Sequence, residues 1–219
     1  MTDTIEILQN YLPQALLDTA YMVGIATIIG VVCGTLLGLL LYLTSQELFA
    51  PHPYINRIAS FLVNAIRSLP FLILLVVLLA PITWLIQDPY TATGGAIALS
   101  IAAIPFYARI AEGAFSEIKT GVIEAAVATG AKTSLIIREV ILPESLPTLI
   151  RGVVLTIISL LGYSAMVGTI GAGGIGDLAI QFGYNRYETG VLIVVVLILI
   201  VVVQLIQWLG DYLAKSFTK

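Results

Sequence analysis

The chain has 219 residues, of which 59% are hydrophobic and only 11% are charged, and its formal net charge is −3. With a mean hydropathy of +1.04, it has too little polar surface for a soluble globular protein. It also has no basic stripe of the kind that binds nucleic acid. We therefore expect a single transmembrane domain, residues 1–219, in contact with membrane lipid.

Hydrophobic segments long enough to cross a bilayer occur five times, since a spanning helix needs about 20 mostly apolar residues. The predicted spans are residues 20–43, 58–86, 94–115, 146–162 and 189–212. The expected fold class is thus an all-α integral membrane protein with five transmembrane helices. Residues 1–19 lack the basic start of a secretory signal, so they are expected to remain as an external N-terminal segment.

The positions of the cations predict the orientation, because lysine and arginine are retained mainly on the cytoplasmic side. If the N-terminus lies outside, every cation except Arg186 falls on or near the inside, Arg67 included. The C-terminus is then cytoplasmic. Residues 116–145 form a cytoplasmic loop, and residues 163–188 form a glycine-rich external loop.

Small residues in the first span predict close helix packing. Gly30, Gly34 and Gly38 recur at four-residue spacing, which flattens one helix face and lets a neighbouring backbone approach. Packing within the subunit is the favoured interpretation, and a subunit interface is the alternative. Cys33, the only cysteine, is expected to be a small buried apolar residue.

Prolines and one charge pair mark the second and third spans. Pro70, Pro81 and Pro105 each remove a backbone hydrogen bond and tend to kink a helix, which suits a gated path but also occurs in ordinary packing. Arg109 and Glu112 lie one helical turn apart, where a structural ion pair is expected.

The cytoplasmic loop is predicted to hold two short helices, at residues 121–131 and 134–141, the second ending before Pro143, with Pro147 at the start of the next span. The first is amphipathic: one face carries Ile123, Val127 and Gly130, and nearby lies a shallow surface of Ala125, Ala128 and Ala131. Such a helix can dock into another protein, lie on the bilayer or pack against its own spans.

The residue sequence of this loop favours docking into another protein. The loop resembles that of ATP-binding-cassette importer permeases, because it contains Glu124-Ala125-Ala126, Gly130 and Leu142-Pro143 in that order. Val140 stands where that family has isoleucine. From about residue 58 to the C-terminus the chain is similar to the methionine-uptake subgroup, on the strength of the segments Arg67-Ser68-Leu69-Pro70-Phe71, Leu161-Gly162-Tyr163-Ser164-Ala165-Met166, Gly171-Ala172-Gly173-Gly174-Ile175-Gly176 and Gly210-Asp211.

This resemblance implies an assembly in a bacterial inner membrane. The expected partners are a second copy of the chain, a cytoplasmic ATP-binding-cassette ATPase dimer, and a substrate-binding lipoprotein or periplasmic protein that delivers methionine. ATP and magnesium are expected in the partner ATPase, and no cofactor on this chain. The residues implied in coupling to the ATPase are Glu124, Ala125, Ala126, Gly130, Leu142 and Pro143.

Motifs for catalysis are not complete in this sequence. The glycines at 171, 173 and 176 match a dinucleotide fingerprint, but a membrane span precedes them instead of a strand. Residues 174–177 match the G-x-G-D motif of intramembrane aspartyl proteases, which need a second aspartate nearby. The other candidate, Asp211, is expected on the opposite side of the bilayer from Asp177, so the two cannot form a catalytic pair. Residues 130–133 lack the Gly-Lys-Thr adjacency of a phosphate loop, and His52 is the only histidine. We expect a transporter subunit rather than an enzyme, and no metal site.

A substrate path is predicted at the outer end of the fourth span. Tyr163 and Ser164 offer hydrogen-bonding groups, and Met166 offers soft apolar contact to a thioether, although Met166 also suits packing or a gate plug. Two other functions stay open. One is import of another small amino acid or anion, and the other is a passive channel or structural membrane subunit, although neither of the latter would need the Glu124 to Pro143 motif.

Overall fold

The computed structural model describes residues 2–49 and 51–217. Over these residues the chain forms helices and no strand, as the hydropathy pattern predicts. The α-helices are α1 (Thr2–Ser45), α2 (Pro53–Ser68), α3 (Phe71–Ile86), α4 (Ala92–Ser116), α5 (Thr120–Ala128), α6 (Thr133–Ile136), α7 (Leu142–Gly168), α8 (Gly174–Leu178) and α9 (Thr189–Phe217). Two π-helical segments, η1 (Ile137–Ile141) and η2 (Ala179–Tyr184), continue α6 and α8.

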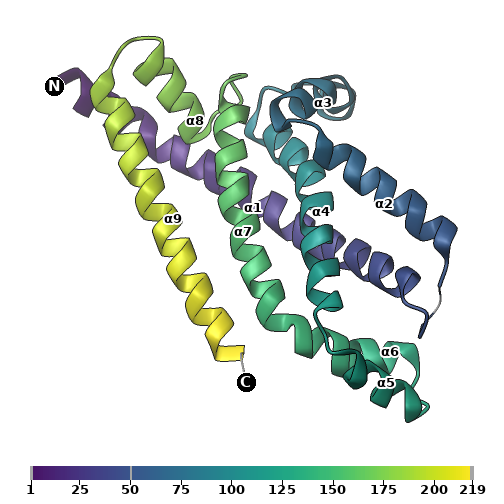
Figure 1. The fold of residues 1–219 in the computed structure, drawn as a ribbon. Helices are drawn as coiled ribbons and strands as arrows, with labels where there is room; N and C mark the ends of the chain where they lie inside the picture. Colours follow the sequence, from purple (N-terminus) through teal and green to yellow (C-terminus); the bar gives the residue numbers. More distant parts are fainter. Residues whose placement is uncertain (1, 50, 218–219) are drawn as a thin grey trace.

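Four of the described helical segments are long and apolar enough to cross a membrane, or five if α2 and α3 count as one bent span. α7 and α9 run side by side, α1 crosses the bundle obliquely, and α4 descends beside α1 (Figure 1). The short helices α5 and α6 lie at the end of the molecule where the chain finishes, and the chain begins at the opposite end (Figure 1).

The first helix is far longer than the predicted span. Its 44 residues extend about 66 Å at 1.5 Å per residue, about twice the apolar thickness of a bilayer. Residues 2–19 therefore belong to α1 instead of forming a separate segment, and Pro13 lies inside the helix without ending it. This first part of α1 is held by packing, because Ala15 is buried in a cluster with side chains of α8, η2 and α9.

The second predicted span is broken into two helices that meet at 107°. The break lies at Leu69-Pro70, where Leu69 has an extended conformation with φ −81° and ψ 132°. Proline disfavours the α region for the residue before it, which explains why α2 ends here. Pro81 and Pro105, by contrast, lie inside α3 and α4 and leave both helices continuous.

This break changes the position of one cation. Arg67 lies in the last turn of α2, about 15 Å along the helix from Arg57. The side of the membrane on which Arg67 lies therefore stays a prediction, and the structure places this residue at the end of α2 that meets α3.

A continuous helix of 36 residues, Thr133–Gly168, joins α6, η1 and α7. The predicted helix stop before Pro143 is wrong, and α7 extends a few residues beyond both predicted ends of the fourth span. In an α-helix a proline ring clashes with the carbonyl four residues back. Here the turn before Pro143 is π-helical, with the Leu142 N–H donating to the carbonyl of Ile137, and this wider turn lets the helix continue.

The predicted external glycine-rich loop is mostly a packed helical hairpin. α7 runs on to Gly168, and the chain then turns through Gly171, whose φ of +84° favours glycine. α8 folds back onto α7 so closely that a Cβ on Gly168 would lie 2.2 Å from the backbone nitrogen of Asp177, and one on Gly176 would lie 2.3 Å from Cα of Ala165. The expectation that these glycines allow tight approach is confirmed.

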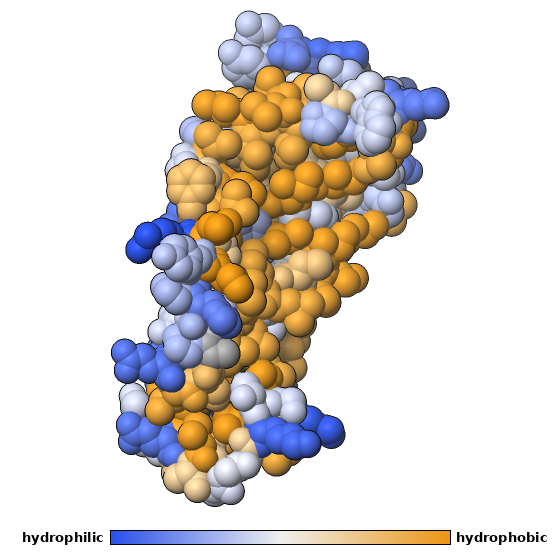
Figure 2. Space-filling view, turned by 90° about the vertical axis from the view of Figure 1, so that its right-hand side faces the viewer, coloured by the Kyte–Doolittle hydropathy of each residue, from blue (hydrophilic) through white to orange (hydrophobic). Residues whose placement is uncertain are grey.

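Apolar side chains cover most of the surface shown in Figure 2, with hydrophilic residues gathered toward the two ends and along one side. Trp84 on α3 and Trp208 on α9 are 89% and 69% exposed. A surface this apolar needs a membrane or a partner subunit to cover it. Cys33 is also exposed on α1, so the prediction that it is buried within the subunit is wrong.

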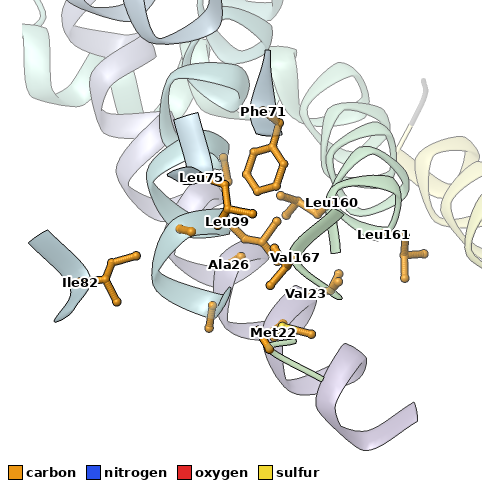
Figure 3. Packing of buried hydrophobic residues seen from close by; sticks show 14 residues of the cluster. Met22, Val23, Ala26, Phe71, Leu75, Ile82, Leu99, Leu160, Leu161 and Val167 are labelled. Carbon is orange, nitrogen blue, oxygen red and sulfur yellow. The ribbon is translucent and has the colours of Figure 1, made fainter. Parts of the chain in front are cut away.

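The main hydrophobic core joins α1, α3, α4 and α7. Figure 3 shows Phe71, at the start of α3, pointing toward Leu160 of α7, with Leu99 of α4 and Met22 of α1 further along the same cluster. A second core at the other end joins α1, α4 and α7 to the short helices α5 and α6. Burial in this second core fixes where α5 can lie.

The glycine repeat of α1 packs against α4 in the same subunit. A Cβ on Gly34 would lie 2.9 Å from the carbonyl oxygen of Ile104, and one on Gly38 would lie 2.6 Å from that of Ala108. The favoured interpretation of the repeat, packing within the subunit, is thus confirmed.

Substituting Gly38 by alanine should loosen the contact between α1 and α4. Because the new methyl group meets backbone, we expect a loss of stability of about 1–3 kcal/mol, measured as a lower Tm in detergent. The control is Gly24→Ala on the same helix, where a Cβ has nothing within 4 Å. Equal Tm values for the two variants would contradict the packing described here.

The predicted ion pair of α4 is present and has further partners. Arg109 Nη1 lies 2.5 Å from Glu112 Oε2. Its Nη2 donates to Asn64 Oδ1 at 3.0 Å and to the carbonyl of Ser60 at 3.3 Å. Since the last two groups belong to α2, the guanidinium also ties α4 to α2.

Candidate functional site

The predicted amphipathic helix of the loop is present as α5. It starts after Lys119, whose φ of −57° and ψ of 127° are not helical, and ends near Gly130. Thr129 N–H donates to the carbonyl of Ala125, and Gly130 N–H to that of Val127. Gly130 has φ +73°, and a Cβ added to it would meet nothing within 4 Å, so glycine is favoured there by backbone conformation alone.

One face of α5 anchors it to the rest of the subunit. Ile123 is only 3% exposed in the second core, and Ala126 and Val127 pack against the same cluster. Ala131, just beyond the helix, packs there too. Of the three options left open by the sequence, packing against its own spans therefore describes this face, which includes Ala126 of the family motif.

The opposite face of α5 is free in the single subunit. Gly121, Glu124, Ala125 and Ala128 lie at i, i+3, i+4 and i+7, so they form one line along the helix, and all four are exposed. We call these four residues the exposed stripe. It offers a shallow apolar surface with one carboxylate, and a partner backbone could approach it closely.

A polar hollow lies beside the start of α5. It has a volume of about 350 Å³ and is bordered by the ends of α4 and α7, with Glu117, Lys119, Val122, Glu144 and Thr148 among its walls. The Thr148 hydroxyl donates to Glu117 Oε2 at 3.3 Å. Sequence reasoning missed these residues because they become neighbours only when α4 and α7 pack.

The last two residues of the predicted coupling motif lie where η1 passes into α7. Leu142 is partly buried against the second core, and Pro143 is exposed. The motif is therefore divided between exposed residues (Glu124, Ala125, Gly130, Pro143) and residues that hold the loop in place (Ala126, Leu142).

The three predicted path residues lie in different environments at the end of α7. Tyr163 stacks on Phe71, with ring centroids 4.7 Å apart. Ser164 is buried, and its hydroxyl donates to the carbonyl of Leu161 in its own helix. Met166 is 41% exposed. The structure thus brings Tyr163 of α7 into contact with an aromatic side chain of α3.

No group of three or more His, Cys, Asp or Glu side chains is placed to hold a metal ion within residues 2–49 and 51–217.

The sequence is similar to those of known transport proteins. Residues 30–219 match the family model described as the inner membrane component of binding-protein-dependent transport systems. A probable D-methionine transport system permease protein, MetI, of Vibrio cholerae is 45% identical over 199 residues, which cover 90% of this chain and 88% of the relative. The methionine import system permease protein MetP of Bacillus subtilis is 41% identical over 82% of this chain.

A solved structure agrees with the fold along nearly the whole length. A chain of the MetNI methionine ABC transporter, in an inward-facing conformation, superposes with a TM-score of 0.93 at 37% identity, and covers 97% of this chain and 98% of that one. With five spans at most, α5 at one end, and a family match over residues 30–219, the chain belongs to the family of binding-protein-dependent transport system inner membrane components.

Proposed function

We propose that this chain is the permease subunit of an ATP-driven methionine importer. The observation that carries the proposal is its likeness to the MetNI methionine transporter, which extends over 97% of the chain with a TM-score of 0.93. The sequence identity of 45% to a D-methionine permease supports the same substrate. A passive channel or a purely structural subunit has no corresponding support.

The subunit works as one of two copies, with an ATPase dimer docked on the exposed stripe. The stripe supports this role because its small residues let another backbone approach, and because the opposite face of α5 is fixed in the second core. ATP and magnesium bind to the ATPase, whereas the permease binds neither. A lipoprotein or periplasmic protein delivers methionine at the other end.

Transport then follows from movement of α5. When nucleotide closes the ATPase dimer, the two α5 helices move toward each other, and α4 and the 36-residue helix Thr133–Gly168 move with them. The path between the two copies alternates between inward-open and outward-open states. Nucleotide binding thereby biases an equilibrium that already exists in the membrane subunits.

The N-terminus is expected outside and the C-terminus in the cytoplasm. Lys215 lies in the last turn of α9, and the chain ends at the same end of the bundle as α5 (Figure 1). A reporter enzyme active only in the periplasm should be active when fused before α1 and inactive when fused after α9. The reverse pattern would contradict this orientation.

Reconstitution tests the function directly. The permease, its ATPase and the binding protein should together accumulate labelled methionine in proteoliposomes only when ATP is supplied. Unlabelled methionine should compete, whereas other small amino acids and anions should not. Uptake without ATP would indicate a channel, and competition only by another solute would overturn methionine as the substrate.

A further inference from the structure

A small pocket lies inside the subunit at the break between α2 and α3. Its volume is about 130 Å³, and its walls come from four helices: Arg67 of α2, Phe71 of α3, Ala102 and Phe106 of α4, and Tyr163 of α7. Four waters at about 30 Å³ each would fill it. The pocket thus suits one small organic group.

Because α4 is long and apolar enough to span the membrane, we place the pocket near the middle of the bilayer. Ala102 and Phe106 flank the middle of α4, which is 25 residues long and spans about 38 Å. Arg67 is about 21 Å along α2 from its first residue, Pro53. A charged side chain at this depth is costly against lipid and almost always faces the bundle interior or a water-filled cavity. The exposed side of Arg67 therefore faces a polar path rather than hydrocarbon.

The charge of Arg67 is not used inside the subunit. Among the residues that the structure describes, the guanidinium of Arg67 has no hydrogen-bond partner and no ion pair. By contrast, the guanidinium of Arg109 in the same bundle has three partners, namely Glu112, Asn64 and Ser60. A guanidinium with five free donors at membrane depth needs an anionic partner from outside the subunit.

Apart from Arg67, the pocket is apolar, with three aromatic residues beside the aliphatic side chains of Ile66, Leu69, Leu74 and Ala102. Phe71 and Tyr163 stack with their rings 10° from parallel, and Phe106 lines the same space. Aromatic rings make favourable contacts with a thioether sulfur. Cation and rings together match an α-amino acid that carries a carboxylate at one end and a soft apolar side chain at the other.

We propose that this pocket is a substrate subsite of the permease, in which Arg67 binds the carboxylate of methionine and the rings of Phe71, Phe106 and Tyr163 contact its thioether chain. The inference rests on the proposed import of methionine. It moves the predicted substrate contacts from Ser164 and Met166 to the break between α2 and α3, and keeps Tyr163.

The test measures methionine uptake and binding in the complete complex. With Arg67→Gln, we expect the KM for ATP-driven uptake to rise about tenfold or more, as expected for loss of a charge-assisted hydrogen-bond pair. Arg57→Gln, on the same helix, is the matched control and should leave the KM unchanged.

A second variant keeps the test informative if Arg67→Gln fails to fold. Ala102→Leu leaves the charge in place and fills part of the pocket, so it should also raise the KM while the complex still copurifies. Wild-type uptake of methionine establishes the function separately from the subsite. If the wild type transports methionine and both variants keep its KM within twofold, the pocket is not a substrate subsite.

Discussion

Replacing Ala125 with arginine is expected to remove most ATP-driven uptake while leaving the permease folded. Ala125 lies in the exposed stripe of α5 and has no role in the subunit's own core. A long charged side chain there would hold the ATPase surface away from the helix. Positions near the centre of an interface are where losses of about 2 kcal/mol or more concentrate, and a loss of this size corresponds to a fall in uptake of about tenfold or more.

Copurification and Tm measurements distinguish a loss of ATPase docking from a loss of folding. The ATPase should no longer copurify with Ala125→Arg, and the Tm of the permease alone should stay at the wild-type value. Ser216→Arg, an exposed position at the end of α9, is the control and should keep full uptake. Wild-type uptake by Ala125→Arg would exclude docking on the stripe. Ala126→Arg is a poorer test because Ala126 packs in the second core.

Replacing Gly168 with alanine is expected to be among the most destabilising changes of a single methyl group in this chain. The added Cβ would lie 2.2 Å from the backbone nitrogen of Asp177, so α8 would have to separate from α7. We expect a loss of about 1–3 kcal/mol, which corresponds to a fall in Tm of roughly 2–4 °C for each kcal/mol.

The control for this variant lies on the same helix. Gly162→Ala places a methyl group where nothing lies within 4 Å, so its Tm should equal that of the wild type or exceed it slightly. If Gly168→Ala also keeps the wild-type Tm, the contact between α7 and α8 is looser than described. A selective fall for Gly168→Ala supports the packed hairpin.

Hydropathy and periodicity predict a large part of this structure. The number of spans follows from apolar length, and the buried face of α5 follows from the spacing of Ile123 and Val127. The flat face of α1 follows from the four-residue glycine repeat. In each case the signal is local, because it is contained within one continuous segment of the sequence.

The remaining features depend on contacts between distant segments. Pro70 ends a helix, whereas Pro81 and Pro147 do not, although all three lack the same backbone donor. The presence of a proline therefore does not by itself predict whether a helix ends. Arg67 and Tyr163 are far apart in sequence, so the pocket that they share has no local pattern.

The long first helix has one more consequence, at the end of the molecule opposite α5. There Ala15 of α1 is buried with Phe182 of η2 and Val191 of α9, and Thr19 accepts a hydrogen bond from the Ile175 N–H at 2.8 Å. Under the orientation proposed above, the surface offered to a delivery protein is thus built from segments that already pack on one another. Docking there would lose little conformational entropy, so a small contact area would be enough for repeated, short-lived encounters.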